Sequence, residues 1–227
     1  MENIFAIYKP KGPTSFDIIR EFQKVLGKKI KIGHAGTLDP LASGVLVVAV
    51  GREATKKISE VVAKEKEYVA DICLGATSTT GDAEGEKVAN LVTRTPNPEE
   101  IQKILPEFIG KIMQTPPIYS ALKIKGKTAY SLAREGKNVV MNPREVFVKE
   151  IEILSYEWPI FKIRVVTGPG VYIRALARDI GERLGTGGYL SGLERTRVGE
   201  FTKETCVSVE VAIKSLSSCV IPSLRGI

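Results

Sequence analysis

The chain has 227 residues, of which 43% are hydrophobic and 26% are charged, and its formal net charge is +7. A chain of this length can bury a sizeable core in one large domain or two small ones. No apolar run approaches the roughly 20 residues that span a bilayer, and the N-terminus is not a signal peptide. The basic balance favours an anionic partner, of which nucleic acid is the commonest.

Strands and helices alternate in the N-terminal half. A short strand over residues 4–8 ends at a Pro/Gly turn, and Thr14 or Ser15 then caps a helix that runs to Leu26 and ends at Gly27. A buried strand over residues 45–50 leads into a short helix, and a further strand over residues 67–74 ends at a turn-rich segment, residues 81–85. The short helix is expected to face inward through Ala54, Ile58, Val61 and Val62.

The C-terminal half continues this mixed pattern. Helices are predicted over residues 98–105 and 128–135, and strands over residues 119–124, 146–156 and 161–167. After a Gly-Pro-Gly turn at residues 168–170, a third helix ends at Gly185. Its apolar face comprises Ile173, Leu176, Ala177, Ile180 and Leu184. The predicted elements therefore form a mixed α and β pattern along the chain.

The cysteines and the single histidine limit the possible chemistry. Cys73, Cys206 and Cys219 are odd in number and widely spaced, which argues against a disulfide framework and favours a reducing, cytoplasmic setting. With one histidine and no CxxC pair, no metal site is expected.

The most informative segment is GHAGTLDPLASGVL, residues 33–46. Its glycines permit unusual backbone conformations, and Pro40 biases Asp39 away from the helical region. Asp39 is therefore expected on a tightly shaped loop that leads into the strand at Val45. On the residues alone, this carboxylate either faces a substrate or caps its own loop in an Asx-type turn.

Three groups of basic residues lie near glycine-rich segments. Lys28, Lys29 and Lys31 precede the loop of Asp39, and Arg195 and Arg197 alternate near the C-terminus. The group at residues 123, 125 and 127 would lie on one face of a strand, because successive side chains point to opposite faces. Each group is either an ordinary solvated face or part of a surface for a polyanion.

Tyr172 and Arg174 follow the turn at residues 168–170. They can converge on one site only if the helix begins near Tyr172, since residues i and i+2 of a helix point to different sides. Arg174 is either a surface residue or the partner of a buried carboxylate, for which a planar guanidinium is well suited. Such a partner would hold Asp39 ionised.

Taken together, these segments resemble the TruB-type pseudouridine synthases. The segment at residues 33–46 is similar to the catalytic motif of the family, and YKPKGPTS, residues 8–15, resembles its N-terminal motif. KEY at residues 66–68 resembles its tyrosine-bearing strand, and PPIYSALK at residues 116–123 with the segment to Gly136 resembles its RNA-binding insert. GVYIR at residues 170–174 and LERTRVG at residues 193–199 resemble its last two motifs. These motifs occur in the family order and cover nearly the whole chain.

The resemblance implies a fold and a reaction. The implied fold is a single catalytic domain of the α+β class over residues 1–227. It has a mixed, mostly antiparallel central sheet flanked by helices, with an RNA-binding insert. Members isomerise a uridine in the T-arm loop of tRNA, at tRNA position 55, to pseudouridine. This chemistry requires a carboxylate but no cofactor, and no membrane or obligate protein partner is implied.

The resemblance also implies roles for individual residues. Asp39 is the catalytic aspartate, Arg174 pairs with it, and Tyr172 is a candidate for removing the proton from C5 of the base. For a base extruded from its loop, Tyr68 stacks on it and Leu193 walls the pocket, as aromatic and apolar groups do around flipped bases.

The remaining roles concern RNA binding. His34 helps to open the RNA loop, and Lys123 belongs to the basic face of the insert. From the residues alone, the favoured interpretation of Tyr68 and Leu193 is as core residues, and that of His34 is as a loop hydrogen-bonder.

Two departures from the family pattern and two alternative functions stand beside this interpretation. Val171 replaces a threonine, and the chain ends about where many members begin a small C-terminal RNA-binding (PUA) domain. An RNA-guided pseudouridine synthase shares the catalytic motif, but residues 116–136 resemble the insert of the stand-alone members. A non-catalytic RNA-binding or tRNA-folding protein would not need Asp39, Tyr172 and Arg174 together.

Overall fold

The computed structural model describes residues 3–124, 126–136 and 139–220. The chain divides into two compact units: unit 1 comprises Met1–Lys66 and Glu194–Ile227, and unit 2 comprises Glu67–Leu193. Strand β12 (Gly188–Val198) runs from unit 2 into unit 1. In the described part of the chain, no helix is long and apolar enough to cross a membrane. The expectation of a single domain stays a prediction.

Unit 1 is organised around strand β3 (Ala42–Val50), which pairs antiparallel with β1 (Ile4–Lys9) and β2 (Ile32–His34). The C-terminal part of β12 follows β3 in the strand order and pairs antiparallel with β13 (Phe201–Thr202). The remaining elements are α1 (Ser15–Leu26), α2 (Arg52–Val62), the 3-10 helix η2 (Lys203–Thr205) and α6 (Val209–Val220).

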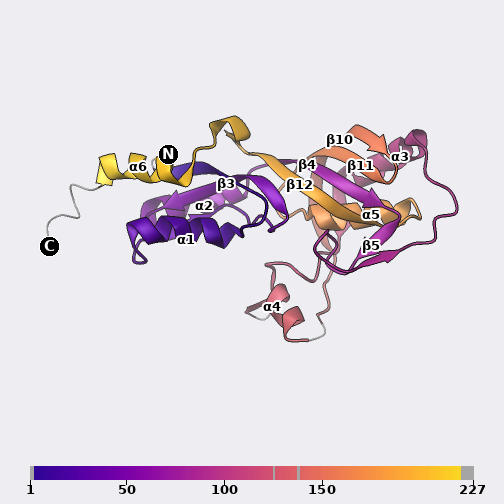
Figure 1. The fold of residues 1–227 in the computed structure, drawn as a ribbon, viewed down its shortest axis with the longest axis horizontal. Helices are drawn as coiled ribbons and strands as arrows, with labels where there is room; N and C mark the ends of the chain where they lie inside the picture. Colours follow the sequence, from indigo (N-terminus) through magenta and orange to yellow (C-terminus); the bar gives the residue numbers. More distant parts are fainter. Residues whose placement is uncertain (1–2, 125, 137–138, 221–227) are drawn as a thin grey trace. The chain divides into compact units, whose positions relative to one another are not determined.

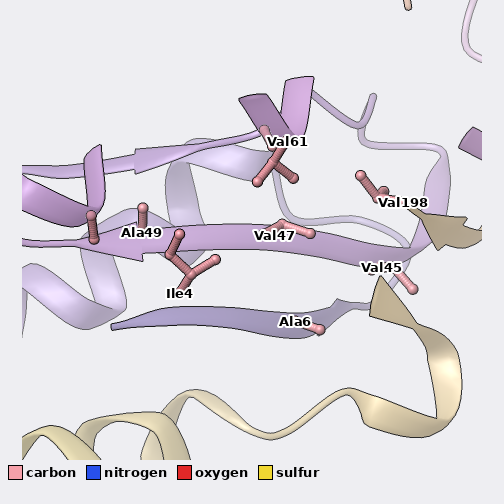
Figure 2. Packing of buried hydrophobic residues seen from close by; sticks show 9 residues of the cluster. Ile4, Ala6, Val45, Val47, Ala49, Val61 and Val198 are labelled. Carbon is pink, nitrogen blue, oxygen red and sulfur yellow. The ribbon is translucent and has the colours of Figure 1, made fainter. Parts of the chain in front are cut away.

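The core of unit 1 follows from the two-residue period of its strands. Val45, Val47 and Ala49 of β3 pack with residues of β1 beneath Val61 of α2 (Figure 2). Leu46 and Val48, which point to the other face of β3, are also fully buried. Strand β3 is therefore covered on both faces, which explains why it is a continuous apolar run.

Unit 2 contains a sheet with the strand order β12-β4-β11-β10-β7. Strand β10 (Arg144–Glu157) pairs antiparallel with β11 (Ile160–Thr167) on one side and with β7 (Gly110–Gln114) on the other. Burial alternates strictly along β4 (Lys66–Leu74), as expected for a strand with one face on a core. The sheet is accompanied by α3 (Pro98–Ile104), the 3-10 helix η1 (Leu105–Phe108), α5 (Ile173–Arg183) and the hairpin of β5 (Ala76–Ser78) with β6 (Lys87–Ala89).

The predicted insert is a separate feature of unit 2. It consists of the hairpin of β8 (Lys123–Ile124) with β9 (Lys127–Thr128), followed by α4 (Ala129–Arg134). Figure 1 shows α4 away from the strands β4, β10 and β11 of this unit. Thr128 caps α4, because its hydroxyl accepts the N–H of Ser131.

The structure confirms the predicted fold class and most of the predicted elements. Thr14 and Asp17 form a reciprocal capping box at the start of α1, and Gly27 ends that helix at a φ of 87°. The predicted strand over residues 119–124 is wrong: only its last two residues are extended. Val62, predicted to face inward, is 38% exposed because it is the last residue of α2.

Candidate active site

Asp39 lies half-buried on a turn in unit 1. Its carbonyl oxygen accepts the N–H of Ala42 at 3.0 Å, with Pro40 at the second position of the turn, where the fixed φ of proline is favoured. The turn leads directly into β3. The loop therefore has the tight shape predicted from its glycine and proline residues.

Hydrogen bonds hold the residues on both sides of Asp39. The hydroxyl of Ser15, which is 2% exposed, donates to the carbonyl of Leu38 at 3.0 Å and accepts the N–H of Leu38 at 2.8 Å. The N–H of Gly12 donates to the carbonyl of Pro40 at 2.8 Å. The N-terminal motif thus fixes the main chain immediately before and after Asp39.

Arg195 of β12 connects the two ends of this loop. Its guanidinium donates from Nε to the carbonyl of Val45 at 2.8 Å and from Nη2 to the carbonyl of Gly36 at 3.1 Å. The side chain is 1% exposed. Since a buried charge needs hydrogen bonds, these carbonyls account for its place in the core of unit 1. The predicted solvated or RNA-facing role of Arg195 is wrong.

His34 lies at the end of β2, opposite Val48 of β3. Burial, followed by the nearby charge of Arg195, lowers the pKa of His34 below its usual 6.5. Among the described residues, its Nδ1 is buried without a hydrogen-bond partner. The ring is therefore neutral at pH 7.

Lys66 is a second basic side chain near this loop. If Gly36 had a side chain, its Cβ would lie 3.7 Å from the Cε of Lys66. Its ammonium donates to the carbonyls of Val62 and Lys64, next to the C-terminus of α2. Burial lowers the pKa of Lys66 to about 8, and the charge of Arg195 acts in the same direction. Positive charge is thus concentrated around Gly36.

In unit 2, Arg174 is held from three sides. It donates to the carbonyls of Thr80 at 3.0 Å and Tyr119 at 2.7 Å, and it forms an ion pair with the carboxylate of Asp82 at 3.6 Å. Both charged side chains are almost completely buried. Asp82 in turn accepts the hydroxyl of Thr80 at 2.5 Å. Arg174 is therefore the partner of a buried carboxylate, one of the two alternatives drawn from the sequence.

Tyr172 is the N-cap residue of α5, so that helix begins where convergence of Tyr172 and Arg174 requires. Its main chain exchanges two hydrogen bonds with the side-chain amide of Gln114. The guanidinium of Arg144 lies 5.1 Å from the centroid of the Tyr172 ring, within the range of a cation–π contact. Tyr172 is therefore held both at its main chain and at the face of its ring.

The remaining predicted site residues of unit 2 differ in exposure. Tyr68 lies on the buried face of β4 and is 7% exposed, and Leu193 of β12 is half-buried. Lys123 is exposed in the insert. His34 and Asp39 belong to unit 1, and the other predicted site residues belong to unit 2. The pairing of Arg174 with Asp39 stays a prediction.

No group of three or more His, Cys, Asp or Glu side chains arranged to hold a metal ion occurs within the described residues.

Comparison with known proteins identifies the family. Residues 23–173 match the TruB family pseudouridylate synthase (N terminal domain), and residues 174–216 match the tRNA pseudouridylate synthase B C-terminal domain. The chain belongs to the TruB family of pseudouridylate synthases. It is thus a pseudouridine synthase, as the motifs at residues 33–46 and 170–174 suggested.

Individual TruB relatives are similar over most of their length. The chain is 48% identical to tRNA pseudouridine synthase B of Parabacteroides distasonis, over 91% of this chain and 90% of that protein. It is also 48% identical to tRNA pseudouridine synthase B of Phocaeicola vulgatus, over 89% and 88%. A solved Cbf5-Nop10-Gar1 complex is similar at a TM-score of 0.70 and 30% identity, over 98% of this chain. The chain covers 57% of that solved chain, slightly more than half.

The lysines of the insert do not lie on one face of a strand, contrary to the prediction from the sequence. Residues 123–124 and residues 127–128 are two short antiparallel strands rather than parts of one strand, with Lys123 opposite Thr128 and Ile124 opposite Lys127. Because cross-strand partners point to the same face, Lys123 and Lys127 point to opposite faces. The predicted common face of lysines is wrong, and Lys125 lies outside the described residues.

The hydrogen bonds of this segment explain why it is not a longer strand. The carbonyl of Tyr119 accepts from Arg174, and the carbonyl of Ser120 accepts the N–H of Tyr130 in α4. Groups that a sheet partner would use are therefore already bound within unit 2.

Sequence reasoning missed four buried polar residues that support the candidate site: Ser15, Asp82, Gln114 and Arg195. Ser15 was read only as a helix cap, and Asp82 only as part of a turn. The one signal available was that each polar residue lies in or next to a motif otherwise rich in Gly, Pro or apolar residues.

Proposed function

We propose that this protein isomerises uridine 55 in the T-arm loop of tRNA to pseudouridine, with Asp39 as the catalytic carboxylate. The observation that carries the proposal is the loop itself. Ser15 binds both main-chain groups of Leu38 and Gly12 binds the carbonyl of Pro40, so that Asp39 is presented between two fixed neighbours. The TruB membership and the names of the relatives, tRNA pseudouridine synthase B, support the same reaction.

The reaction is an isomerisation and needs no oxidant or reductant. The bond between C1′ of the ribose and N1 of the base breaks, the base turns, and a bond forms between C1′ and C5. C5 then loses its proton, and N1 ends with one. In this scheme Asp39 attacks the sugar carbon or stabilises the positive charge that develops on it. The oxygen of Tyr172 takes the proton from C5 as its own hydroxyl proton passes to water, and N1 gains its proton from water. The positive charge of Arg174 keeps Asp39 ionised.

The base must leave the folded RNA loop to reach these groups. Tyr68 stacks on the extruded uracil, and Leu193 forms an apolar wall beside it. The neutral ring of His34 fills the place that the base vacates. Lys123, exposed in the insert, contacts a phosphate of the T-arm.

An RNA-guided function is the second candidate, because this chain is also similar to a solved H/ACA RNP bound to a substrate RNA containing 2'-deoxyuridine. That similarity is 29% identity over 53% of the solved chain. The relatives named tRNA pseudouridine synthase B are 48% identical over about nine-tenths of their length. The stand-alone tRNA enzyme is therefore favoured. We place it in the cytoplasm, consistent with Cys73 and Cys206 being free thiols.

The deciding experiment incubates the purified protein with an unmodified tRNA transcript, without guide RNA or added cofactor, and maps pseudouridine by position. Modification at position 55 alone is expected. Modification that requires a guide RNA would support the second candidate, and modification at another position would contradict the proposed substrate site.

Asp39→Asn tests the catalytic carboxylate. This variant keeps the size and hydrogen-bonding capacity of the side chain but removes its charge. We expect the single-turnover rate to fall by about 1,000-fold or more, equal to about 4 kcal/mol of transition-state stabilisation. Binding of tRNA, measured by filter retention, should remain. Substantial turnover by Asp39→Asn would refute the assignment, and equal loss of binding would point to a role in holding RNA.

A further inference from the structure

Gln114 is a buried polar residue at the end of an edge strand. It is the last residue of β7, lies opposite Arg144 of β10, and is 1% exposed. A buried carboxamide requires hydrogen bonds at both its oxygen and its nitrogen. Those bonds show what the residue does.

Both ends of the Gln114 carboxamide bind the same distant residue. Its Oε1 accepts the N–H of Tyr172 at 2.8 Å, and its Nε2 donates to the carbonyl of Tyr172 at 3.2 Å. That carbonyl also accepts the N–H of Leu176 at 3.1 Å, which begins α5. Gln114 thus fixes the position at which the helix begins, although 58 residues separate it from Tyr172.

Arg144, the cross-strand neighbour of Gln114, holds the ring of the same tyrosine. Its guanidinium lies over the Tyr172 ring and donates to the carbonyl of Gly170, two residues earlier. One pair of facing residues on β7 and β10 therefore controls the main chain, the ring and the preceding turn. Gln114 could satisfy its own hydrogen bonds with any main-chain groups nearby. Instead, Gln114 and its neighbour Arg144 both bind Tyr172 or the turn before it.

We propose that Gln114 is a positioning residue for Tyr172, and that it acts on the chemical step through the main chain of that tyrosine. The inference rests on the function proposed above, in which the Tyr172 phenol removes the proton from C5. Proton transfer needs the donor and acceptor within hydrogen-bond reach, and a displacement of about 1 Å can cost about a hundredfold in rate. Gln114 prevents such a displacement by binding both main-chain groups of Tyr172.

Two variants separate this role from general stability. Gln114→Met keeps the length of the side chain but removes both hydrogen bonds. Gln114→Glu keeps an acceptor, but when ionised it places a second oxygen against the carbonyl of Tyr172. Only its protonated form restores a donor there. Tyr156→Phe is the matched control, since it removes a side-chain hydrogen bond to the carbonyl of Pro96 in the same unit.

The measurements are the single-turnover rate of pseudouridine formation at saturating tRNA, the Kd for tRNA, and circular dichroism at the assay temperature. For Gln114→Met we expect a rate about 10- to 100-fold below wild type, with little change in Kd. The rate of Gln114→Glu, relative to wild type, should rise as the pH falls from about 8 to about 6, because burial favours the protonated carboxyl. Tyr156→Phe should have the wild-type rate.

A folded Gln114→Met with the wild-type rate, or a loss explained by Kd alone, would overturn the proposal. If Gln114→Met does not fold, Gln114→Glu decides: a rate deficit that is independent of pH would also overturn it. An inactive wild type would instead contradict the proposed function. The positioning role would then be judged from amide hydrogen exchange, which should become faster at Tyr172 in Gln114→Met and would overturn the proposal if unchanged.

Discussion

Gly44 provides a sharp test of how the loop of Asp39 is built into unit 1. It lies in β3 with a φ of 110°, a conformation that L side chains rarely adopt. A Cβ at this position would lie 2.2 Å from the carbonyl oxygen of Arg195 and 2.7 Å from its nitrogen. The main chain of β12 therefore approaches β3 more closely than any side chain at residue 44 permits.

The cost of Gly44→Ala has two parts. A positive φ costs about 1–2 kcal/mol in a residue that has a Cβ. Overpacking against main chain that cannot move freely adds about 1–3 kcal/mol. Gly12→Ala is the matched control, because Gly12 has the same φ of 110° and nothing lies within 4 Å of its added Cβ. The difference between the two variants, about 1–3 kcal/mol, isolates the close approach of Arg195.

Thermal unfolding followed by circular dichroism measures this difference. For a chain of this length about 1 kcal/mol corresponds to 2–4 °C, so Gly44→Ala should melt about 2–12 °C below Gly12→Ala. Its pseudouridine synthase rate should also fall at temperatures below the melting transition, because displacement of β12 moves the guanidinium of Arg195 away from Val45 and Gly36. Equal melting temperatures for the two variants would refute the close approach.

Two further predictions concern charged groups. Arg174→Lys should lower the single-turnover rate by about a hundredfold, because an ammonium cannot reproduce the fork that binds the carbonyls of Thr80 and Tyr119 and the carboxylate of Asp82; a near-normal rate would show that this geometry is unimportant. Burial lowers the pKa of Lys66 from 10.5 to about 8, so between these pH values the unfolded chain binds more protons and the stability of wild type should rise with pH. Urea unfolding at about pH 7.5 and about pH 9.5 should show this rise relative to Lys66→Met, in which the residue cannot titrate, and parallel changes in the two proteins would contradict the shifted pKa.

Features that depend on neighbouring residues could be predicted from the sequence. The capping of α1 by Thr14 and its end at Gly27 depend on main-chain groups within a few residues, and the structure confirms both. The alternation along β4 likewise reflects one strand with one buried face. The turn at Asp39 and Pro40 belongs to the same class, but the bonds from Ser15, Gly12 and Arg195 that hold the loop come from distant residues.

Features that depend on distant partners could not be predicted. Arg195 reads as a surface residue in LERTRVG, but its carbonyl partners at Val45 and Gly36 are 150 and 159 residues away. Lys123 and Lys127 alternate in the sequence, yet the chain reverses between them and points them apart. Strand β12 was missed because glycines and charged residues interrupt its apolar pattern. This strand approaches neighbouring main chain closely, so small and charged residues take the place of a regular apolar face.

The supports of the candidate catalytic residues share one physical property. Ser15 and Gln114 bind main-chain groups, of Leu38 next to Asp39 and of Tyr172 itself. These bonds do not use the carboxylate or the phenol, so position is controlled without changing the chemistry of the group. Each support is buried, where a hydrogen bond is not weakened by competing water. A substitution at a support should therefore change the rate by moving the reacting atoms, whereas a substitution at Asp39 or Tyr172 removes them.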